Sequence, residues 1–293
     1  METPAMNPIL ADLLHLLELE RIEVDIFRGE SRDIGAPQVF GGQVLGQALS
    51  AASKTVAGRV VHSLHSYFLR RGDFNASIVY HVDRSRDGGS FSARRVVAIQ
   101  HGRPIFTLSC SFQVPEQGIE HQVDMPEVPG PEGLADVTDL YAEDLERVPE
   151  KMRRFLTRKR PFDFRPVDPV NFLQPEKRKP VKAVWLRATD ALPDNDQLHR
   201  VLLAYVSDYE LLGTAALPHA IRFGHDAVQM ASLDHAMWFH RPPRVDEWFL
   251  YTSDSPSAQG GRGLARGMFF SRDGMLIAST AQEGLIRVLD RAD

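Results

Sequence analysis

Residues 88–113 read GGSFSARRVVAIQHGRPIFTLSCSFQ, and residues 260–285 read GGRGLARGMFFSRDGMLIASTAQEGL. At an offset of 172 (260 − 88 and 277 − 105) the two stretches share glycines, an Ala-Arg pair and an isoleucine. The matched residues are Gly88, Gly89, Ala93, Arg94, Gly102 and Ile105 in the first stretch, and Gly260, Gly261, Ala265, Arg266, Gly274 and Ile277 in the second. Self-similarity at a fixed offset indicates a repeated structural module. The chain is therefore predicted to contain two copies of one fold, in one constant register.

Each copy is predicted to consist of a strand, a helix and then several antiparallel strands, because apolar residues at helical spacing are followed by apolar runs between turn residues. In the first copy we expect helices over 9–20 and 43–56, and strands over 20–28, 60–69, 76–83, 91–100 and 104–114. In the second we expect a strand through Trp185, a helix over 201–212, and strands over 229–240, 246–254, 262–272 and 275–288. A sheet of this kind needs a helix against its hidden face. Two such units side by side predict an α+β pair that shares one continuous sheet.

The segment between the two copies has a different composition. Ten of the nineteen prolines fall between residues 115 and 180, where apolar runs of strand length are few. Proline interrupts regular structure, so we expect one helix near 139–158 and otherwise extended chain. The predicted organisation is an N-terminal unit over 1–114, a proline-rich linker over 115–180 and a C-terminal unit over 181–293.

The composition is that of an ordinary globular protein. The 293 residues are 43% hydrophobic and 25% charged, with a net charge of −5, which argues against disorder. No long basic run with interleaved aromatics occurs, so no nucleic-acid partner is expected, and no apolar stretch reaches membrane-spanning length. The single cysteine allows no internal disulfide, and acidic residues interrupt the N-terminal apolar pattern, unlike in a signal peptide. We therefore expect a cytoplasmic location.

The two copies differ on one face of their last long strand. In the first copy this face carries Phe106, Leu108, Cys110 and Phe112, which alternate with polar residues and predict a core-facing strand. At the same places the second copy has Ala278, Thr280, Gln282 and Gly284. A buried amide needs a hydrogen-bond partner, and the lost ring volume must be refilled or left open. The alternative is that this strand is solvated and its glutamine has no special role.

Two further polar residues of the second copy stand among apolar ones. Asp208 falls at helical spacing from Val201, Tyr205 and Leu212, which places a carboxylate inside an apolar stripe. Ser232 begins the run Ser-Leu-Asp-His-Ala-Met-Trp-Phe-His-Arg over 232–241. Each residue alone is also consistent with a structural role. Because the helix over 201–212 should pack beside strands 229–240 and 275–288, the three side chains Asp208, Ser232 and Gln282 are expected to converge.

These residues closely resemble the acyl-CoA thioesterase II type, a family of double-hotdog hydrolases. The resemblance spans nearly the whole chain and is carried by Phe40-Gly41-Gly42-Gln43, the run from His62 to Arg70, Arg86-Asp87-Gly88-Gly89, the run from Leu203 to Asp208, residues 232–241, and Ala281-Gln282-Glu283-Gly284. It implies a double hotdog, in which two antiparallel sheets each wrap around a central helix and join into one sheet. It also implies a homodimer or a higher homo-oligomer.

The resemblance further implies that Asp208, Ser232 and Gln282 position a water that attacks the thioester carbonyl of an acyl-CoA. The chemistry agrees with these residue types, because a thioester is already electrophilic and needs only a positioned water and a base. Asp208 would be the base, with a pKa raised by its apolar setting. Ser232 and Gln282 would hold the water or donate to the oxyanion. No cofactor and no metal are expected.

Two other functions remain open at this point. A hotdog hydratase or dehydratase would need an Asp and His pair, and Asp234-His235 supplies these residue types. Adjacent residues on a strand point to opposite faces, however, so these two are not expected to converge. A non-catalytic acyl-CoA-binding or assembly module is the other alternative, and loss of Asp208 or Gln282 would have favoured it.

Overall fold

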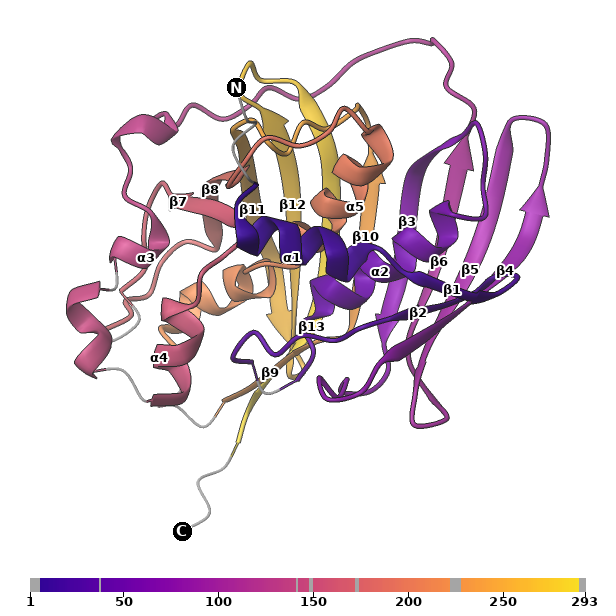
Figure 1. Cartoon of the computed structure of the whole chain (residues 1–293). Coiled ribbons are helices and arrows are strands. Elements are labelled where there is room, and N and C mark those ends of the chain that lie inside the picture. The colour runs from indigo at the N-terminus through magenta and orange to yellow at the C-terminus, as the bar shows by residue number, and fades with distance from the viewer. Residues whose placement is uncertain are drawn as a thin grey trace.

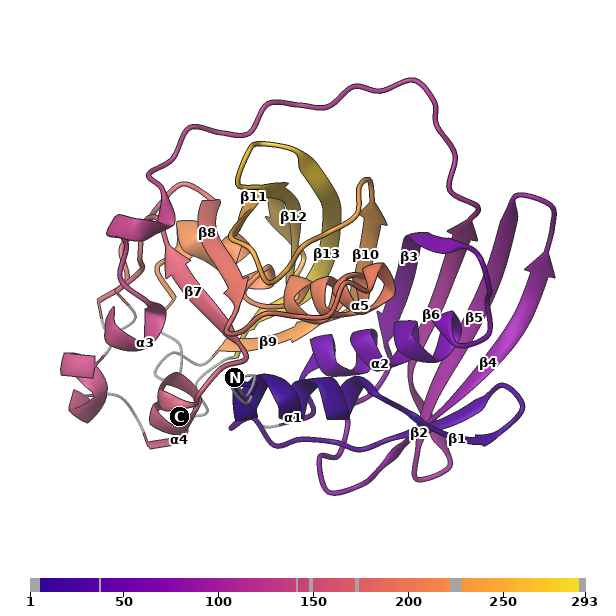
Figure 2. The ribbon, with the colours of Figure 1, turned by 45° about the horizontal axis from the view of Figure 1, so that its top comes forward.

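The computed structural model describes residues 6–289 apart from 37, 141, 148–149, 172–173 and 222–227. Its thirteen described strands form one antiparallel sheet that curls around two central helices (Figures 1 and 2). The first half contains α1 (Pro8–Leu17), β1 (Glu20–Glu23), β2 (Ile26–Gly29), α2 (Gly41–Ser53), β3 (Val60–Phe68), β4 (Ile78–Asp87), β5 (Phe91–Gln100) and β6 (Arg103–Gln113). The middle segment contains η1 (Pro131–Gly133), α3 (Val137–Leu140), η2 (Ala142–Arg147), α4 (Glu150–Thr157) and β7 (Phe162–Pro166). The second half contains β8 (Val181–Ala188), α5 (Asp196–Ser207), η3 (Leu212–His219), β9 (Val228–Ser232), β10 (Asp234–Phe239), β11 (Phe249–Gln259), β12 (Arg262–Ser271) and β13 (Leu276–Val288).

The strand order is the same in the two halves when each is read from the centre of the sheet. The order is β1-β2-β4-β5-β6-β3-β10-β13-β12-β11-β8-β7, and β9 also pairs with β13. The halves meet at β3 and β10, where Leu64 lies opposite Met237 and both are fully buried. The prediction of two like units that share one continuous sheet is confirmed, and the architecture is that of the expected double hotdog.

Helices α2 and α5 lie in the hollow of the sheet and form the centre of the core. Nearly every residue of α2 is buried, and so is the run from His199 to Ser207 of α5, as expected for helices that are covered on all sides. The buried Gln47 side chain of α2 has partners within the protein. Gln47 donates to the Leu16 carbonyl and accepts from the Tyr80 hydroxyl, both at 2.7 Å. Both helices are therefore packed within the core, and their ends can hold side chains in defined positions.

The register between the two copies differs by one residue from the prediction on their first two long strands. Asp83 lies opposite Arg95 and Asp254 lies opposite Arg266, an offset of 171 (254 − 83 and 266 − 95), and a β-bulge follows in both copies. The offset returns to 172 on β6 and β13 because the connection between β12 and β13 is one residue longer than that between β5 and β6. The repeat is real, but its register is not constant.

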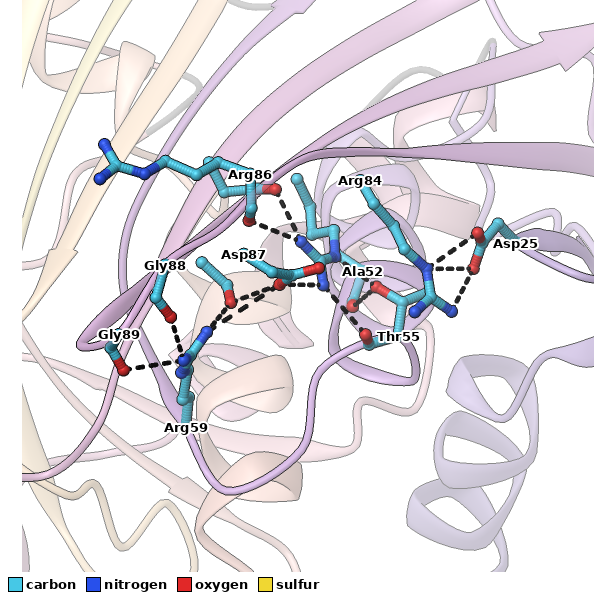
Figure 3. A network of polar contacts seen from close by, with 12 residues as sticks. Asp25, Ala52, Thr55, Arg59, Arg84, Arg86, Asp87, Gly88 and Gly89 are labelled. Atoms are coloured by element: carbon cyan, nitrogen blue, oxygen red, sulfur yellow. Dashed lines mark hydrogen bonds and ion pairs between the residues drawn. The ribbon is translucent and has the colours of Figure 1, made fainter.

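A one-residue shift moves a side chain to the other face of the sheet. Arg94 therefore corresponds to Ala265 and not to Arg266. The Arg94 side chain points into the first copy, where it donates to the Thr55 hydroxyl at 2.8 Å and to Asp87 at 2.7 Å, within the polar network of Figure 3. It is 1% exposed, whereas the Arg266 side chain is 59% exposed.

The expected strand over 20–28 is two short strands. β1 and β2 form a hairpin with Asp25 in the left-handed conformation at φ 58°. Its apolar residues Ile22 and Val24 are about half exposed, at 49% and 57%. The alternation of apolar and charged residues here does not mark a buried face.

The middle segment runs over the surface of the second half. It contains several short helices instead of the single helix expected near 139–158, and its β7 pairs with β8 at the edge of the sheet (Figure 1). The division of the chain at residues 114 and 180 stays a prediction. Within the described part of the chain, no helix is long and apolar enough to cross a membrane.

Candidate active site

Asp208 lies at the end of helix α5, where the chain leaves the helix. The helix ends at Ser207, and Asp208 is its C-terminal cap. The expected helix over 201–212 is thus too long, because Glu210 adopts a left-handed φ of 58° that a right-handed helix cannot include. The partly buried carboxylate of Asp208 stands at the helix terminus and not inside an apolar stripe.

The first turn of α2 faces this carboxylate. The two helices lie side by side (Figure 2) and run antiparallel, since the first turn of α2 contacts the last turn of α5. A Cβ atom on Gly41 would lie 2.6 Å from Asp208 Oδ2, and one on Gly42 would lie 2.2 Å from the Tyr205 carbonyl oxygen. Only glycine allows this close approach of the two helices. The Gly42 N–H also hydrogen-bonds the Asp208 carboxylate, at the positive end of the α2 dipole.

Gln282 reaches Asp208 from the sheet. It lies on the inner face of β13, is 0% exposed and stands opposite Ala265, whose small side chain leaves room for it. Its Nε2 donates to Asp208 Oδ1 at 2.6 Å and lies 3.2 Å from Nδ1 of His235. Its Oε1 is buried and has no hydrogen-bond partner among the described residues. The alternative of a solvated strand is therefore excluded.

The surroundings shift the pKa values of the two ionisable groups in this cluster. Burial raises the pKa of Asp208 to about 6, against the opposing effect of the hydrogen bonds from Gln282 and Gly42. Burial lowers the pKa of His235 to about 3, so its ring is neutral near pH 7. Asp208 is thus a carboxylate that ionises close to neutrality, as a general base requires.

Ser232 lies on the same face of the sheet as Gln282 but does not bond to it. It ends β9 and pairs with Gly284 of β13, two residues from Gln282. Paired residues of antiparallel strands point to the same face, and diagonal neighbours lie ~7–8 Å apart. In the described part of the chain, no hydrogen bond joins Ser232 to Asp208 or Gln282. Of the three expected site residues, two are in direct contact and the third is beside them.

Asp234 and His235 point to opposite faces, as expected. Asp234 Oδ1 accepts a hydrogen bond from the Glu283 backbone N–H at 2.6 Å on the outer side of the strand. His235 points inward and is fully buried. The pair therefore cannot converge on one substrate atom in the manner of a hydratase.

From the sequence, His235 was considered only as part of this pair. In the structure it contacts Gln282 on one side and Ser207 on the other, with its Nε2 2.9 Å from Ser207 Oγ. The inward orientation of His235 could have been predicted from the sequence. Met237 and Phe239 share the strand parity of His235, and an apolar parity predicts an inward face.

A half-open pocket of about 240 Å³ lies between α1, α4 and the end of α5. Tyr205 and Tyr209 are among its lining residues, and their rings pack against Phe40 at centroid distances of 5.3 and 4.4 Å. Phe40 immediately precedes the Gly41-Gly42 pair beside Asp208. The rim is mostly cationic and is lined by Arg32, Arg154, Arg158 and Lys159, with Asp12 and Asp33 between them.

The chain is similar to known proteins in both of its halves. Residues 156–285 match a family described as acyl-CoA thioesterase, and residues 28–113 match one described as acyl-CoA thioesterase N-terminal domain. Acyl-CoA thioesterase 2 of Haemophilus influenzae is 44% identical over 96% of this chain and 99% of its own length. Human acyl-coenzyme A thioesterase 8 is 44% identical over 93% of this chain and 88% of its own.

A solved structure extends the likeness to three dimensions. The crystal structure of the acyl-CoA thioesterase II TesB2 from Mycobacterium marinum aligns with a TM-score of 0.78 at 41% identity, over 96% of this chain and 99% of that chain. The fold and the sequence similarity over almost the full length lead to the same conclusion. The chain belongs to the acyl-CoA thioesterase family.

Proposed function

We propose that this protein hydrolyses acyl-CoA thioesters to a free carboxylic acid and CoA, with Asp208, Gln282 and Ser232 as its catalytic residues. The observation that carries the assignment is the contact between Asp208 and Gln282 at 2.6 Å, at the N-terminus of α2. Membership of the acyl-CoA thioesterase family supports the substrate class.

In the proposed reaction, Asp208 accepts a proton from a water whose oxygen attacks the thioester carbonyl carbon. The carbonyl oxygen becomes an oxyanion, and collapse of this tetrahedral intermediate breaks the C–S bond. The proton held by Asp208 passes to the leaving thiolate, so the carboxylate is regenerated. A base with a pKa of about 6 is mostly ionised at pH 7 and still basic enough to assist attack.

Gln282 and Ser232 supply neutral polar groups around that water. Because the Nε2 of Gln282 is bound to Asp208, its unpartnered Oε1 is the atom available to accept a hydrogen bond from the attacking water. The Ser232 hydroxyl, on the same face of the sheet, holds the water or donates to the oxyanion. Fixed dipoles of this kind stabilise developing charge without reorganisation during the reaction.

The test is a steady-state assay of free CoA release from short, medium, long and branched acyl-CoAs. Asp208→Asn and Gln282→Leu are expected to lower kcat by about 100-fold or more. Ser232→Ala should lower kcat, whereas Ser232→Thr, which keeps the hydroxyl, should restore it. Asp234→Asn is the matched control, because Asp234 is a neighbouring carboxylate on the other face, and it should retain activity.

The alternatives are separate outcomes of this assay. Binding of acyl-CoA with no CoA release by the wild-type protein would favour a non-catalytic binding module. Hydration of an enoyl-CoA without hydrolysis would favour the hydratase. Near-normal hydrolysis by Asp208→Asn would refute the catalytic assignment.

The pocket beside Tyr209 is our candidate for the nucleotide part of CoA. That part combines an aromatic base with phosphates, and the pocket combines aromatic rings with cations. Lys159 has no ion-pair partner among the described residues, and the Arg158 guanidinium lies 5.7 Å from the centre of the Tyr209 ring. Cations of this kind attract phosphates over several ångströms.

We also propose a homodimer or a higher homo-oligomer in the cytoplasm. The support is the outer face of β3 and β10 at the centre of the sheet, where Tyr67 and Trp238 are 60% and 38% exposed and the Trp238 ring packs on His65. Aromatic residues of this size are enriched in protein interfaces. Light scattering after size exclusion tests the assembly, and a Trp238→Lys variant that turns monomeric would locate it.

A further inference from the structure

A continuous chain of polar contacts extends from Asp208 through the sheet and back to the helix that carries it. Gln282 Nε2 lies 2.6 Å from Asp208 Oδ1 and 3.2 Å from His235 Nδ1. His235 Nε2 lies 2.9 Å from Ser207 Oγ, and this hydroxyl donates to the Ala204 carbonyl oxygen at 2.8 Å. Gln282, His235 and Ser207 are all fully buried. Because the Ser207 hydroxyl and the His235 ring are closed off from bulk solvent, the hydrogen atoms in the chain of contacts can be assigned by elimination.

The assignment begins at the Ala204 carbonyl, which can only accept. The single hydroxyl hydrogen of Ser207 is therefore used, and its oxygen must accept from His235 Nε2–H. His235 is neutral because its burial lowers its pKa to about 3. A neutral ring with a hydrogen on Nε2 has a lone pair on Nδ1. That lone pair faces the Gln282 amide.

The lone pair on His235 and the carboxylate of Asp208 together fix the Gln282 amide. Its NH2 group has two hydrogens, one for each of these acceptors. A rotated amide would bring Oε1 to 2.6 Å from a carboxylate oxygen and to 3.2 Å from the Nδ1 lone pair, two contacts between acceptors. The observed orientation turns Oε1 away from both, and Oε1 is the atom with no partner in the described structure.

The first copy of the fold lacks this chain. The strand pairing places Leu64 opposite Cys110 in the first copy and Ala236 opposite Ala281 in the second, so Leu64 stands where the second copy has His235. Cys110 stands where the second copy has Gln282. Helix α2 also ends on a serine, Ser53, but its hydroxyl is buried without a partner among the described residues. The histidine and the glutamine therefore occur together, in the copy that has the carboxylate.

We propose that His235 and Ser207 are positioning residues for the hydrolysis reaction: Ser207 fixes the tautomer of His235, and His235 holds the Gln282 amide with Oε1 directed at the attacking water. The inference rests on the proposed function of Asp208 and Gln282. Neither His235 nor Ser207 contacts the substrate, so their effect falls on kcat through the placement of the water and leaves KM nearly constant.

Two nearly isosteric variants of His235 test the proposal. Asn places an acceptor oxygen near the position of Nδ1, whereas Leu has the same shape and no acceptor. His235→Leu should lower kcat by about 10- to 100-fold with KM changed less than about threefold, because a misplaced catalytic group costs that much. His235→Asn should recover most of the loss. Inactivity of both variants alike, or wild-type kcat in His235→Leu, would overturn the proposal.

His199 supplies the matched control. It is also buried and neutral in character, with its ring bonded to the Pro193 carbonyl and the Val245 N–H, both at 3.2 Å, away from Gln282. His199→Leu and His199→Asn should give equal kcat values per folded molecule. A difference as large as that between the His235 variants would mean that loss of any buried histidine acts through stability.

Two further measurements do not depend on the folding of a His235 variant. The ¹⁵N chemical shifts of His235 in the wild-type protein should show a protonated Nε2 and a bare Nδ1, and Ser207→Ala should admit the other tautomer and lower kcat. A protonated Nδ1 in the wild type would refute the chain of contacts. In a double-mutant cycle, His235→Leu should add nothing once Gln282 is Leu.

The failure of this inference differs from the failure of the proposed function. If the wild-type protein releases no CoA from any acyl-CoA, the proposed function is refuted. If wild-type protein is active, Asp208→Asn is inactive and His235→Leu is normal, only the positioning role falls.

Discussion

The carboxylate of Asp208 should make the folded protein less stable at neutral pH than at acidic pH. Burial raises its pKa from an ordinary 3.8 to about 6, and this difference corresponds to at most ~3 kcal/mol, because the side chain is still partly exposed. Below pH 3.8 the group is protonated in both folded and unfolded states, and stability is unaffected. Between pH 3.8 and about pH 6 the folded state binds more protons than the unfolded state, so the free energy of unfolding falls as pH rises. Above about pH 6 the full cost applies.

Replacement of Asp208 by Asn removes this titration. We expect the free energy of unfolding of Asp208→Asn, measured in urea relative to wild type, to increase by up to ~3 kcal/mol between pH 4 and pH 8. The Asn side chain must turn its NH2 toward either the Gln282 or the Gly42 donor, but that cost is the same at both pH values and cancels. Asp208→Ala should change the free energy of unfolding by a different pH-independent amount, but its difference from wild type should vary with pH in the same way as that of Asp208→Asn.

The same ionisation should appear in catalysis. The kcat/KM of the wild-type protein is expected to fall about tenfold per pH unit below about pH 6 and to level off above it, because only the ionised carboxylate accepts a proton. A stability difference that stays constant from pH 4 to pH 8 would refute the reasoning, since Asp208 would then ionise alike in the folded and unfolded chain. A pH profile without an inflection near 6 would remove Asp208 as the base.

Three other substitutions test separate parts of the structure. Gly41→Ala should lower kcat at least about tenfold in the CoA-release assay, because its Cβ would lie 2.6 Å from the Asp208 carboxylate, whereas the Cβ of Gly89→Ala meets nothing within 4 Å and should leave kcat unchanged. Arg94→Ala should lower the free energy of unfolding by ~3 kcal/mol or more, because it leaves the partners of a buried charge unpaired. Arg266→Ala, at the exposed position, should lower it by less than ~1 kcal/mol. Urea unfolding of both variants measures this difference. Lys159→Glu should raise the KM for acyl-CoA several-fold at unchanged kcat, an effect that rising salt should weaken; equal KM values would exclude the pocket as the phosphate site.

The inner face of the last long strand was predictable because strand parity depends only on sequence. Phe106 and Phe112 are buried in the first copy, and Gln282 is buried at the equivalent face of the second. A glutamine in such a position must find partners, and it finds the carboxylate that the sequence had also singled out. The contact between Asp208 and Gln282 could therefore be predicted from the sequence, because a buried glutamine needs a hydrogen-bond partner and Asp208 was the polar residue expected beside it.

The register of the repeat was not predictable in the same way. Identity of Arg94 and Arg266 suggested one constant offset, but identical residues need not be equivalent when a turn differs in length. The buried face of β5 and β12 follows from hydrogen bonding between strands, which sequence matching does not see. Likewise Ile22 and Val24 alternate with charged residues as in a buried strand, yet they lie in a hairpin at the edge of the sheet and are about half exposed.

The end of α5 shows the same limit. Leu211 and Leu212 continue the apolar spacing of the helix and are buried, so periodicity alone extends the helix past Asp208. The chain instead turns at Glu210, and the buried leucines belong to the following segment. Where a helix stops depends on what its last turn meets, which here is the first turn of α2.

The two copies carry different residues at the same place on the inner face of the sheet. In the first copy, the pair Arg94 and Cys110 fills the space that Ala265 and Gln282 occupy in the second. The buried guanidinium of Arg94 donates to Thr55 and Asp87, whereas the carboxylate of Asp208 lies where burial opposes its ionisation. A second carboxylate of that kind would cost up to another ~3 kcal/mol, against a total stability of ~5–15 kcal/mol for a typical domain. The duplicated fold thus combines a stabilising network in the first copy with the proposed catalytic residues in the second.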